Sequence, residues 1–200
     1  MSDPTGLVFP DAFETERLVI RAPRPGDGQE LYAAIIESLP ELEPWMPWAH
    51  DPQSPMSCEN NVLSAYTDFL ARRDLRLQLY LRSAPETMVG SSGLHRIDWS
   101  VPRFEIGYWL RTRFAGQGYA TEAVRGVAGF AFRELGAERL EIWCDERNER
   151  SAAVARHAGF HHDATLRDRH RAVDGSLATD LGFGLLRDEG LQTLGLGAPP

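Results

Sequence analysis

Two glycines between a predicted strand and a predicted long helix constrain the fold of this chain most strongly. Gly116 and Gly118 follow an alternating segment at 103–111 and precede a segment at 118–135 whose apolar residues recur at helical spacing. Glycine allows the tight turn that such a connection needs, and the first N–H groups of a helix have no partner within it. The pattern predicts backbone amides gathered at one point, which suits an anion. The alternative is a plain strand–helix turn.

Two common phosphate-binding motifs do not fit this segment. A dinucleotide-binding fold needs a third glycine and a parallel β-α-β unit at the start of the chain. A Walker phosphate loop needs a lysine, and all 21 Lys or Arg positions of this chain are arginine. The absence of lysine also excludes a lysine Schiff base and a lysine general base. The segment therefore predicts a phosphate-bearing cofactor of another kind.

The order of predicted elements indicates one mixed α+β domain at 14–189, with flexible termini at 1–13 and 190–200. Three consecutive strands with short turns between them favour an antiparallel meander. Asp27 is a candidate N-cap for the first helix. The segment 40–55 holds five prolines and is predicted to be a loop. The predicted strands are 17–21, 75–82, 87–98, 103–111, 140–144, 165–171 and 179–186, and the predicted helices begin at 27, 57, 118 and 151.

Charge and composition exclude several classes of function. The formal net charge is −8, which argues against non-specific binding to nucleic acid or to an anionic membrane and favours a cationic acceptor. No segment resembles a signal peptide or approaches the roughly 20 apolar residues of a membrane span. Two cysteines are too few for a disulfide framework, so we expect a cytoplasmic protein. His161, His162 and His170 lack partners at metal-ligand spacing, so no metal site is predicted.

A second segment carries polar residues where a strand meets a helix. Asn148 and Ser151 open the short helix at 151–158, where they can cap the helix or face a ligand. Together the two segments resemble the GCN5-related N-acetyltransferase (GNAT) family. Further matches, at 15–18, 44–48, 105–110 and 174–176, resemble its RimJ/RimL-type branch. The pyrophosphate loop of that family, [QR]-x-x-G-x-[GA], is matched by Arg113, Gly116 and Gly118. Its segment N-x-x-S-x-x-V-x-x-x-x-G-F is matched by Asn148, Ser151, Val154, Gly159 and Phe160.

The resemblance covers about residues 14–189 and implies a fold and a cofactor. The implied fold is a mostly antiparallel sheet of about seven strands, splayed at a cofactor cleft and flanked by about four helices. The implied co-substrate is acetyl-CoA, with Arg111 offsetting its charge. The implied cofactor-binding residues are Trp109, Leu110, Arg111, Arg113, Phe114, Ala115, Gly116, Gln117, Gly118, Tyr119, Asn148 and Ser151.

The same resemblance implies transfer of an acetyl group to a primary amine through a direct ternary complex. Many relatives use a tyrosine seven residues after the asparagine, but that position is Ala155 here, and Ser151 is the implied partner of the sulfur. Glu105 on the central strand is the first candidate for the general base, with pairing to an arginine as the alternative. His95 on the preceding strand is a weaker candidate for that role.

The acceptor is predicted to be a small-molecule amine or a protein N-terminus, bound beside Trp45, Trp48 and Glu105. The tryptophans can alternatively be core anchors of a long loop. We expect a monomer or a homodimer that binds neither nucleic acid nor membrane. The alternative function is a sensor or interaction module that binds acyl-CoA without turnover, for which the missing tyrosine at Ala155 is the only hint.

Overall fold

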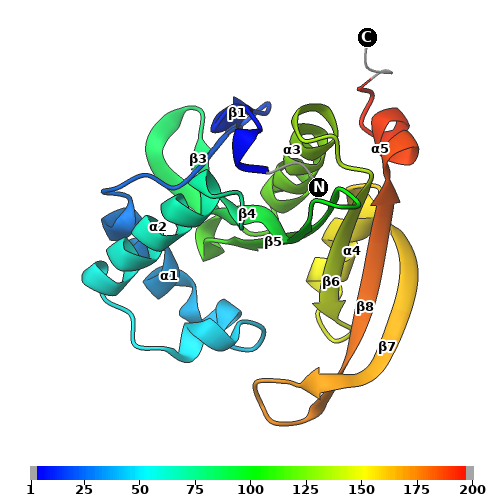
Figure 1. The fold of residues 1–200 in the computed structure, drawn as a ribbon. Coiled ribbons are helices and arrows are strands. Elements are labelled where there is room, and N and C mark those ends of the chain that lie inside the picture. The colour runs from blue at the N-terminus through cyan, green and yellow to red at the C-terminus, as the bar shows by residue number, and fades with distance from the viewer. Residues whose placement is uncertain (1–3, 197–200) are drawn as a thin grey trace.

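The fold is built around one eight-stranded sheet (Figure 1). The structure is a computed structural model and describes residues 4–196. The strand order is β1-β2-β3-β4-β5-β6-β8-β7, and every neighbouring pair is antiparallel except β5 and β6. The strands are β1 (Ala12–Glu14), β2 (Leu18–Arg21), β3 (Leu75–Leu81), β4 (Ala84–Asp98), β5 (Arg103–Leu110), β6 (Arg139–Asp145), β7 (His161–Arg171) and β8 (Leu177–Leu186).

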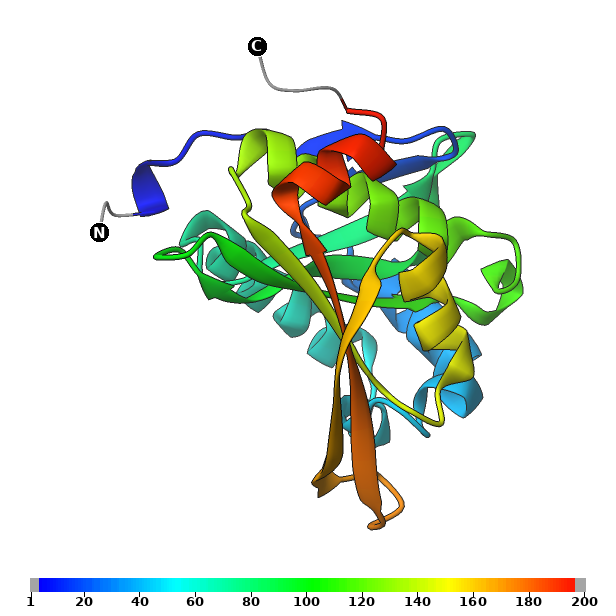
Figure 2. The same cartoon turned by 90° about the vertical axis from the view of Figure 1, so that its right-hand side faces the viewer.

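Helices cover both faces of the sheet (Figures 1 and 2). Alternation along β3 separates two apolar clusters: Leu77 and Leu79 join the larger one around α3, whereas Tyr80 joins a smaller one under α1 and α2. The α-helices are α1 (Gly28–Leu42), α2 (Pro55–Leu70), α3 (Tyr119–Glu134), α4 (Glu149–His157) and α5 (Arg187–Thr193). The 3₁₀ turns are η1 (Pro4–Gly6), η2 (Pro47–His50) and η3 (Thr112–Phe114). The predicted α+β class and splayed, mostly antiparallel sheet are confirmed.

The sheet opens between its two parallel strands. β5 and β6 are paired only from Arg103↔Arg139 to Glu105↔Glu141, although each strand continues beyond that point. β6, β8 and β7 then turn away from the rest of the sheet, and the β7–β8 hairpin extends beyond the body of the molecule (Figure 2). Within residues 4–196, the second half of β5 therefore has an edge without a neighbouring strand.

The prediction of a loop at 40–55 is wrong in part, because Pro40 lies inside the last turn of α1. A proline there removes one backbone hydrogen bond close to the helix end, where the loss is small. α2 begins at Pro55, two residues before the predicted start, since proline is favoured in the first turn of a helix. Ser54 and Ser57 complete a capping box at that end.

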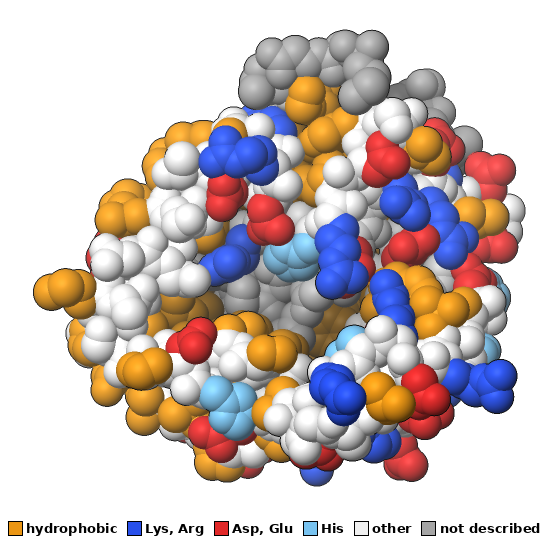
Figure 3. Space-filling model, turned by 60° about the horizontal axis from the view of Figure 1, so that its bottom comes forward, with side chains coloured by type: hydrophobic (Ala, Val, Ile, Leu, Met, Phe, Trp, Pro, Cys, Tyr) orange, Lys and Arg blue, Asp and Glu red, His pale blue; other side chains and the backbone are white. Residues whose placement is uncertain are grey.

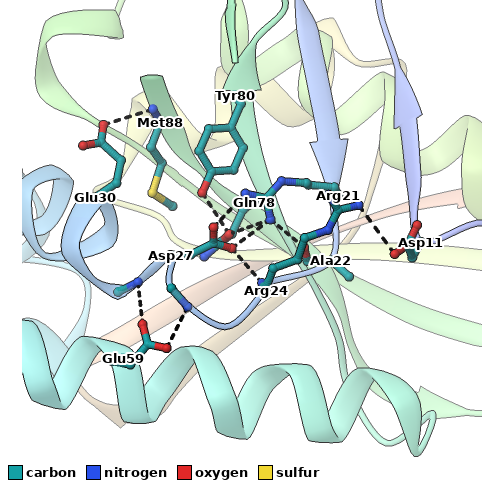
Figure 4. A network of polar contacts seen from close by, with 12 residues as sticks. Asp11, Arg21, Ala22, Arg24, Asp27, Glu30, Glu59, Gln78, Tyr80 and Met88 are labelled. Atoms are coloured by element: carbon teal, nitrogen blue, oxygen red, sulfur yellow. Dashed lines mark hydrogen bonds and ion pairs between the residues drawn. The ribbon is translucent and has the colours of Figure 1, made fainter. Parts of the chain in front are cut away.

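The start of α1 is held from another helix. Asp27 occupies the N-cap position but makes no capping hydrogen bond, and its carboxylate binds Arg21 instead. The N–H groups of Gly26 and Gly28 donate to Glu59 of α2, at 2.8 and 2.9 Å (Figure 4). The predicted capping role of Asp27 is thus taken by a carboxylate from a distant part of the sequence.

The ordered elements extend slightly past the predicted domain. β1 begins at Ala12 and pairs with β2, and α5 contacts α3 and ends at Thr193. These parts of the predicted flexible termini are therefore ordered, and residues 1–3 and 197–200 lie outside the described residues. Within the described part of the chain, no helix has the length and apolar character needed to cross a membrane.

Glu122 in the first turn of α3 connects this helix to the segment between β1 and β2. Its carboxylate accepts hydrogen bonds from Thr15 Oγ1 at 2.6 Å, Arg17 N at 2.7 Å and Arg17 Nε at 2.6 Å. Burial alone would raise the pKa of Glu122, but these hydrogen bonds and the Arg17 charge hold that pKa below its usual value.

We predict that Glu122→Gln lowers the free energy of unfolding by about 1–2 kcal/mol at pH 7, because it removes charge-assisted hydrogen bonds. Since the pKa of Glu122 is depressed in the folded state, its stabilisation is complete above the unfolded pKa of about 4.3 and declines as pH falls through the folded value. Urea unfolding at pH 7, 5 and 3.5 measures the difference. The exposed Glu134→Gln on the same helix is the control, and an equal loss there would contradict the assignment.

Candidate active site

The glycine segment presents a run of free backbone amides beside the open edge of β5. The N–H groups of residues 116–121 have no acceptor among the described residues. Gly116 and Gly118 have φ of +74° and +82°, a conformation that glycine adopts without strain. Gly118 is the N-cap of α3 and provides no side-chain cap, so the positive end of the helix faces outward. These residues fit the pyrophosphate of a nucleotide cofactor.

Arg17 holds the same loop from behind. Its Nη1 donates to the carbonyl of Gln117 at 2.9 Å, and its guanidinium lies over the ring of Tyr119 at 4.2 Å. With this carbonyl bound on the protein side, the amides of the loop remain available for a ligand. The exposed Arg113 lies 3.7 Å from Glu37 at the edge of the segment, and residues 115–118 are exposed as well.

Tyr108 and Ser151 meet across the gap between β5 and α4. The Tyr108 hydroxyl donates to the Ser151 carbonyl at 3.0 Å and lies 2.9 Å from Ser151 Oγ. Burial is the main cause that raises the pKa of Tyr108 above its usual value, so this phenol keeps its proton at neutral pH. Sequence reasoning did not select Tyr108, because its contact with Ser151 joins residues 43 positions apart.

Asn148 combines the two predicted roles. Its Oδ1 accepts the N–H of Ser151 at 3.0 Å and so caps α4. The amide group of the same side chain has no acceptor among the residues that the structure describes, so it is free to donate to a ligand. Cys144, which is half-buried on β6, lies near Ser151, and burial raises the pKa of its thiol.

A pocket of about 470 Å³ lies on the opposite face of β5, under α1, η2 and α2. Figure 3 shows a hollowed face of the molecule with arginine and carboxylate side chains around its rim. Trp48 and Trp109 line the pocket, with ring centroids 6.1 Å apart. Trp45 does not line it and is 37% exposed, so the predicted wall of two loop tryptophans is replaced by one loop tryptophan and one strand tryptophan.

His95 lies in this pocket with one ring nitrogen bound to a carboxylate. Nδ1 is 2.6 Å from Asp74 Oδ2, whereas Nε2 has no hydrogen-bond partner among the described residues. The ring lies across the paired glycines Gly93 and Gly107: a Cβ at either position would come within about 3 Å of it. Two neighbouring glycines therefore make the space that this ring occupies.

Glu105 pairs with His95 across β4 and β5, but its side chain binds an arginine and does not line the pocket. Its carboxylate binds Arg96 at 2.9 Å, and it is absent from the residues that line the pocket. The structure therefore shows the alternative expected for Glu105, an ion pair with an arginine. Arg96 itself reaches this position from a backbone with φ of +46° at an irregularity of β4.

Arg111 is buried and already compensated. Its Nε binds Glu37 at 2.7 Å and its Nη1 binds Glu30 at 2.8 Å, and Glu30 also accepts the N–H of Met88 (Figure 4 shows the Glu30–Met88 contact). The expectation that the Arg111 charge offsets a bound cofactor is therefore corrected, because two carboxylates from α1 neutralise it. Its role in the site is to fix the end of β5 against α1.

The described residues contain no group of three His, Cys, Asp or Glu side chains placed to hold a metal ion. What they do contain is a split sheet with an anion site at one end of the split. A partly buried pair of hydroxyl groups lies beside the split, and a pocket with an oriented histidine lies on the other face. This combination suits transfer of a group from a phosphate-bearing carrier to a small nucleophile.

Comparisons with known proteins agree with this chemistry. The family described as "Acetyltransferase (GNAT) domain" matches residues 17–161. The chain is 29% identical over 154 residues to "Putative ribosomal N-acetyltransferase YdaF" of Bacillus subtilis, covering 76% of this chain and 82% of that protein. It is 28% identical over 176 residues to "Uncharacterized N-acetyltransferase p20" of Bacillus licheniformis, covering 88% and 96%.

Solved structures share the fold. A structure titled "Crystal structure of Probable acetyltransferase" superposes with a TM-score of 0.81 at 27% identity, covering 89% of this chain and 98% of that one. RimL, a ribosomal L7/L12 α-N-protein acetyltransferase solved with coenzyme A, gives a TM-score of 0.80 at 19% identity, covering 88% and 97%. The resemblance seen in the sequence is confirmed: this chain belongs to the GNAT family and is an acetyl-CoA-dependent N-acetyltransferase.

Proposed function

We propose that this acetyltransferase binds its amine acceptor in the pocket under α1 and α2 and acetyl-CoA in the gap between β5 and β6. The observation that supports this is the position of β5, which borders both spaces. Among the described residues, no strand pairs with its edge beyond Glu105, and Gly107, Tyr108 and Trp109 of β5 line the pocket. Trp109 and Leu110 would hold the pantetheine arm through their backbone, with the amides of 116–121 around the pyrophosphate.

Acetyl transfer forms a C–N bond and breaks a C–S bond, and acetyl-CoA supplies the activated acetyl thioester. The protein must accept a proton from the ammonium and return one to the leaving sulfur. The backbone N–H near Leu110, on the free edge of β5, would polarise the thioester carbonyl.

His95 is the residue we propose for the first task, in place of Glu105. Asp74 binds Nδ1, which fixes the tautomer whose Nε2 carries the free lone pair in the pocket. A histidine held by a carboxylate in this way is a common general base. Glu105 would then act through Arg96 on the shape of β4.

Ser151 and Tyr108 are the residues we propose for the second task. The Tyr108 hydroxyl can donate to Ser151 Oγ at 2.9 Å, and with this donor the Ser151 hydroxyl keeps its own proton for the sulfur. Because the Tyr108 phenol keeps its proton, the pair offers a neutral acid that compensates for the alanine at 155. The nearby Asn148 amide would bind the pantetheine arm.

A protein N-terminus is the acceptor class that the comparisons support. YdaF carries a name that specifies ribosomal N-acetylation, and the RimL title specifies α-N-acetylation of L7/L12. A small-molecule amine fits the size of the pocket equally. A cytoplasmic location and a monomeric or dimeric state remain predictions from the sequence.

The function is tested by measuring coenzyme A release from acetyl-CoA with a panel of N-terminal peptides and small amines. We expect release above the buffer rate, with a matching acetylated product by mass spectrometry. Gly118→Val is the control, because a side chain at φ +82° distorts the amide cradle, and cofactor binding should fall at least tenfold. Tight acetyl-CoA binding without product on any acceptor would instead favour the non-catalytic sensor.

We predict that Ser151→Ala lowers kcat about tenfold to a hundredfold with little change in acetyl-CoA affinity, because it removes the donor to the leaving sulfur. Tyr108→Phe should lower kcat less, since Ser151 remains. Steady-state kinetics and calorimetric titration with acetyl-CoA separate the two effects. A parallel loss of affinity in Ser151→Ala would show that Ser151 serves cofactor binding.

We predict that His95→Ala lowers kcat/KM by about 10²-fold or more, because no other pocket residue has a free nitrogen base. Asp74→Asn should have a smaller effect of the same sign. Added imidazole should restore part of the His95→Ala activity, which a purely structural role would not allow. Glu105→Gln is the matched comparison and should stay within about threefold. The reverse ranking of the two variants would return the role of base to Glu105.

A further inference from the structure

Arg76 carries an uncompensated charge in the acceptor pocket. It lies on β3, and its side chain lines the pocket together with Asn61 of α2. Its Nη1 donates to Asn61 Oδ1, and no carboxylate lies within 4.0 Å of its guanidinium among residues 4–196. A guanidinium has five N–H donors, so most of its hydrogen-bonding capacity is unused here.

Two other arginines that are buried or half-buried near this pocket are paired with carboxylates. Arg21 binds Asp27 at 2.8 Å, and Arg111 binds two carboxylates. A charge in a concave, partly apolar site is costly unless a counter-charge completes it. The other ionisable groups that line the pocket are the exposed Asp51, which makes no ion pair with Arg76, and His95, whose own carboxylate is Asp74. Cys58 and Tyr108 line it as well, and burial raises the pKa of both groups, so they stay uncharged at neutral pH.

Arg76 and His95 lie close together on the neighbouring strands β3 and β4, because Arg76 pairs with Gly93, over which the His95 ring packs. A Cβ built on Gly93 would lie 2.9 Å from the Cε1 and Nε2 atoms of His95 and 3.0 Å from the Cα of Arg76. That position is too close to both groups for a side chain, so glycine at 93 lets the His95 ring pack beside the backbone of Arg76, and both residues line the same pocket. An acceptor whose amine approaches Nε2 therefore has the Arg76 side chain beside it.

We propose that Arg76, with Asn61, forms an anion subsite that binds a carboxylate of the acceptor, so that the preferred substrates are amines that carry a carboxylate. The guanidinium can bind a carboxylate through two parallel hydrogen bonds, and Asn61 orients the guanidinium from α2. The inference rests on the proposed function and assigns its substrate class. The carboxylate can belong to a free amino acid or to an acidic side chain near a peptide N-terminus.

The experiment compares acceptors that differ only in that charge. Serine is paired with serinamide. The peptide Ser-Asp-Ala is paired with Ser-Asn-Ala, and both peptides are amidated at the C-terminus. The first pair tests a free amino acid and the second an acidic side chain. For the pair that fits the site, Arg76→Gln should lower kcat/KM on the carboxylate member about tenfold or more and change the amide member less than about threefold. Arg76→Lys should recover part of the preference.

The ratio within each pair separates recognition from folding, because a poorly folded variant loses activity on both members. Arg133→Gln, an exposed arginine on α3, removes the same charge elsewhere and should leave the ratio unchanged. An unchanged ratio in Arg76→Gln for both pairs would overturn the subsite while leaving the acetyltransferase assignment intact.

A binding measurement covers the case in which no tested amine is acetylated, which would count against the proposed function alone. Trp48 and Trp109 line the pocket, so tryptophan fluorescence can follow titration with N-acetylserine and N-acetylserinamide in the presence of coenzyme A. We expect tighter binding of N-acetylserine by the unchanged protein and no such preference in Arg76→Gln. Equal binding of the two compounds by the unchanged protein would overturn the subsite.

Discussion

The short pairing of two parallel strands determines where every part of the site lies. β5 and β6 share hydrogen bonds only as far as Glu105 and Glu141, and beyond that point the sheet is open. Parallel neighbours need a crossover, which is α3 here, and such a helix begins where the first strand ends. The N-terminus of α3 therefore lies at the end of β5 where the gap is open. The free amides of 116–121 and the free edge of β5 are thus two consequences of one connection.

The fold was predictable where local pattern and long-range packing agree. The alternation of β3 to β5 and the helical period of α3 mark elements that bury one regular face, so their positions follow from the residues themselves. Prediction failed where a distant group replaced a local one. Asp27 has the chemistry of a helix cap, yet it is taken by Arg21, and Glu59 caps the helix from 31 residues away from Gly28. A local stretch of sequence around Asp27 does not include Glu59, so it cannot predict that Glu59 replaces Asp27 as the cap.

The same reasoning explains the outcome for the catalytic candidates. Alternation places Glu105 on the pocket side of β5, and a cross-strand neighbour at His95 follows from the meander. Alternation does not predict which side chain binds Glu105 and which binds His95. An irregular turn of β4 brings Arg96 to Glu105, whereas the residue before β3, Asp74, reaches His95 from 21 positions away. The carboxylate of Glu105 is bound in an ion pair, whereas that of Asp74 orients His95, the base that we propose, so the partners reverse the ranking that residue type suggests.

Charge shows most clearly how a total misrepresents a site. A net charge of −8 favours a cationic ligand when it is read as an average field. In the folded protein, however, many carboxylates are bound to arginines, as in the pairs of Arg111 with Glu30 and Glu37. A paired charge contributes little to the field at a distance, so the local potential is determined by the few groups left without a partner. At the loop of α3 these are backbone amides, and in the proposed acceptor pocket they include Arg76, with the exposed Asp51 at another part of the lining. The loop amides and Arg76 are both positive, although the protein that holds them is acidic.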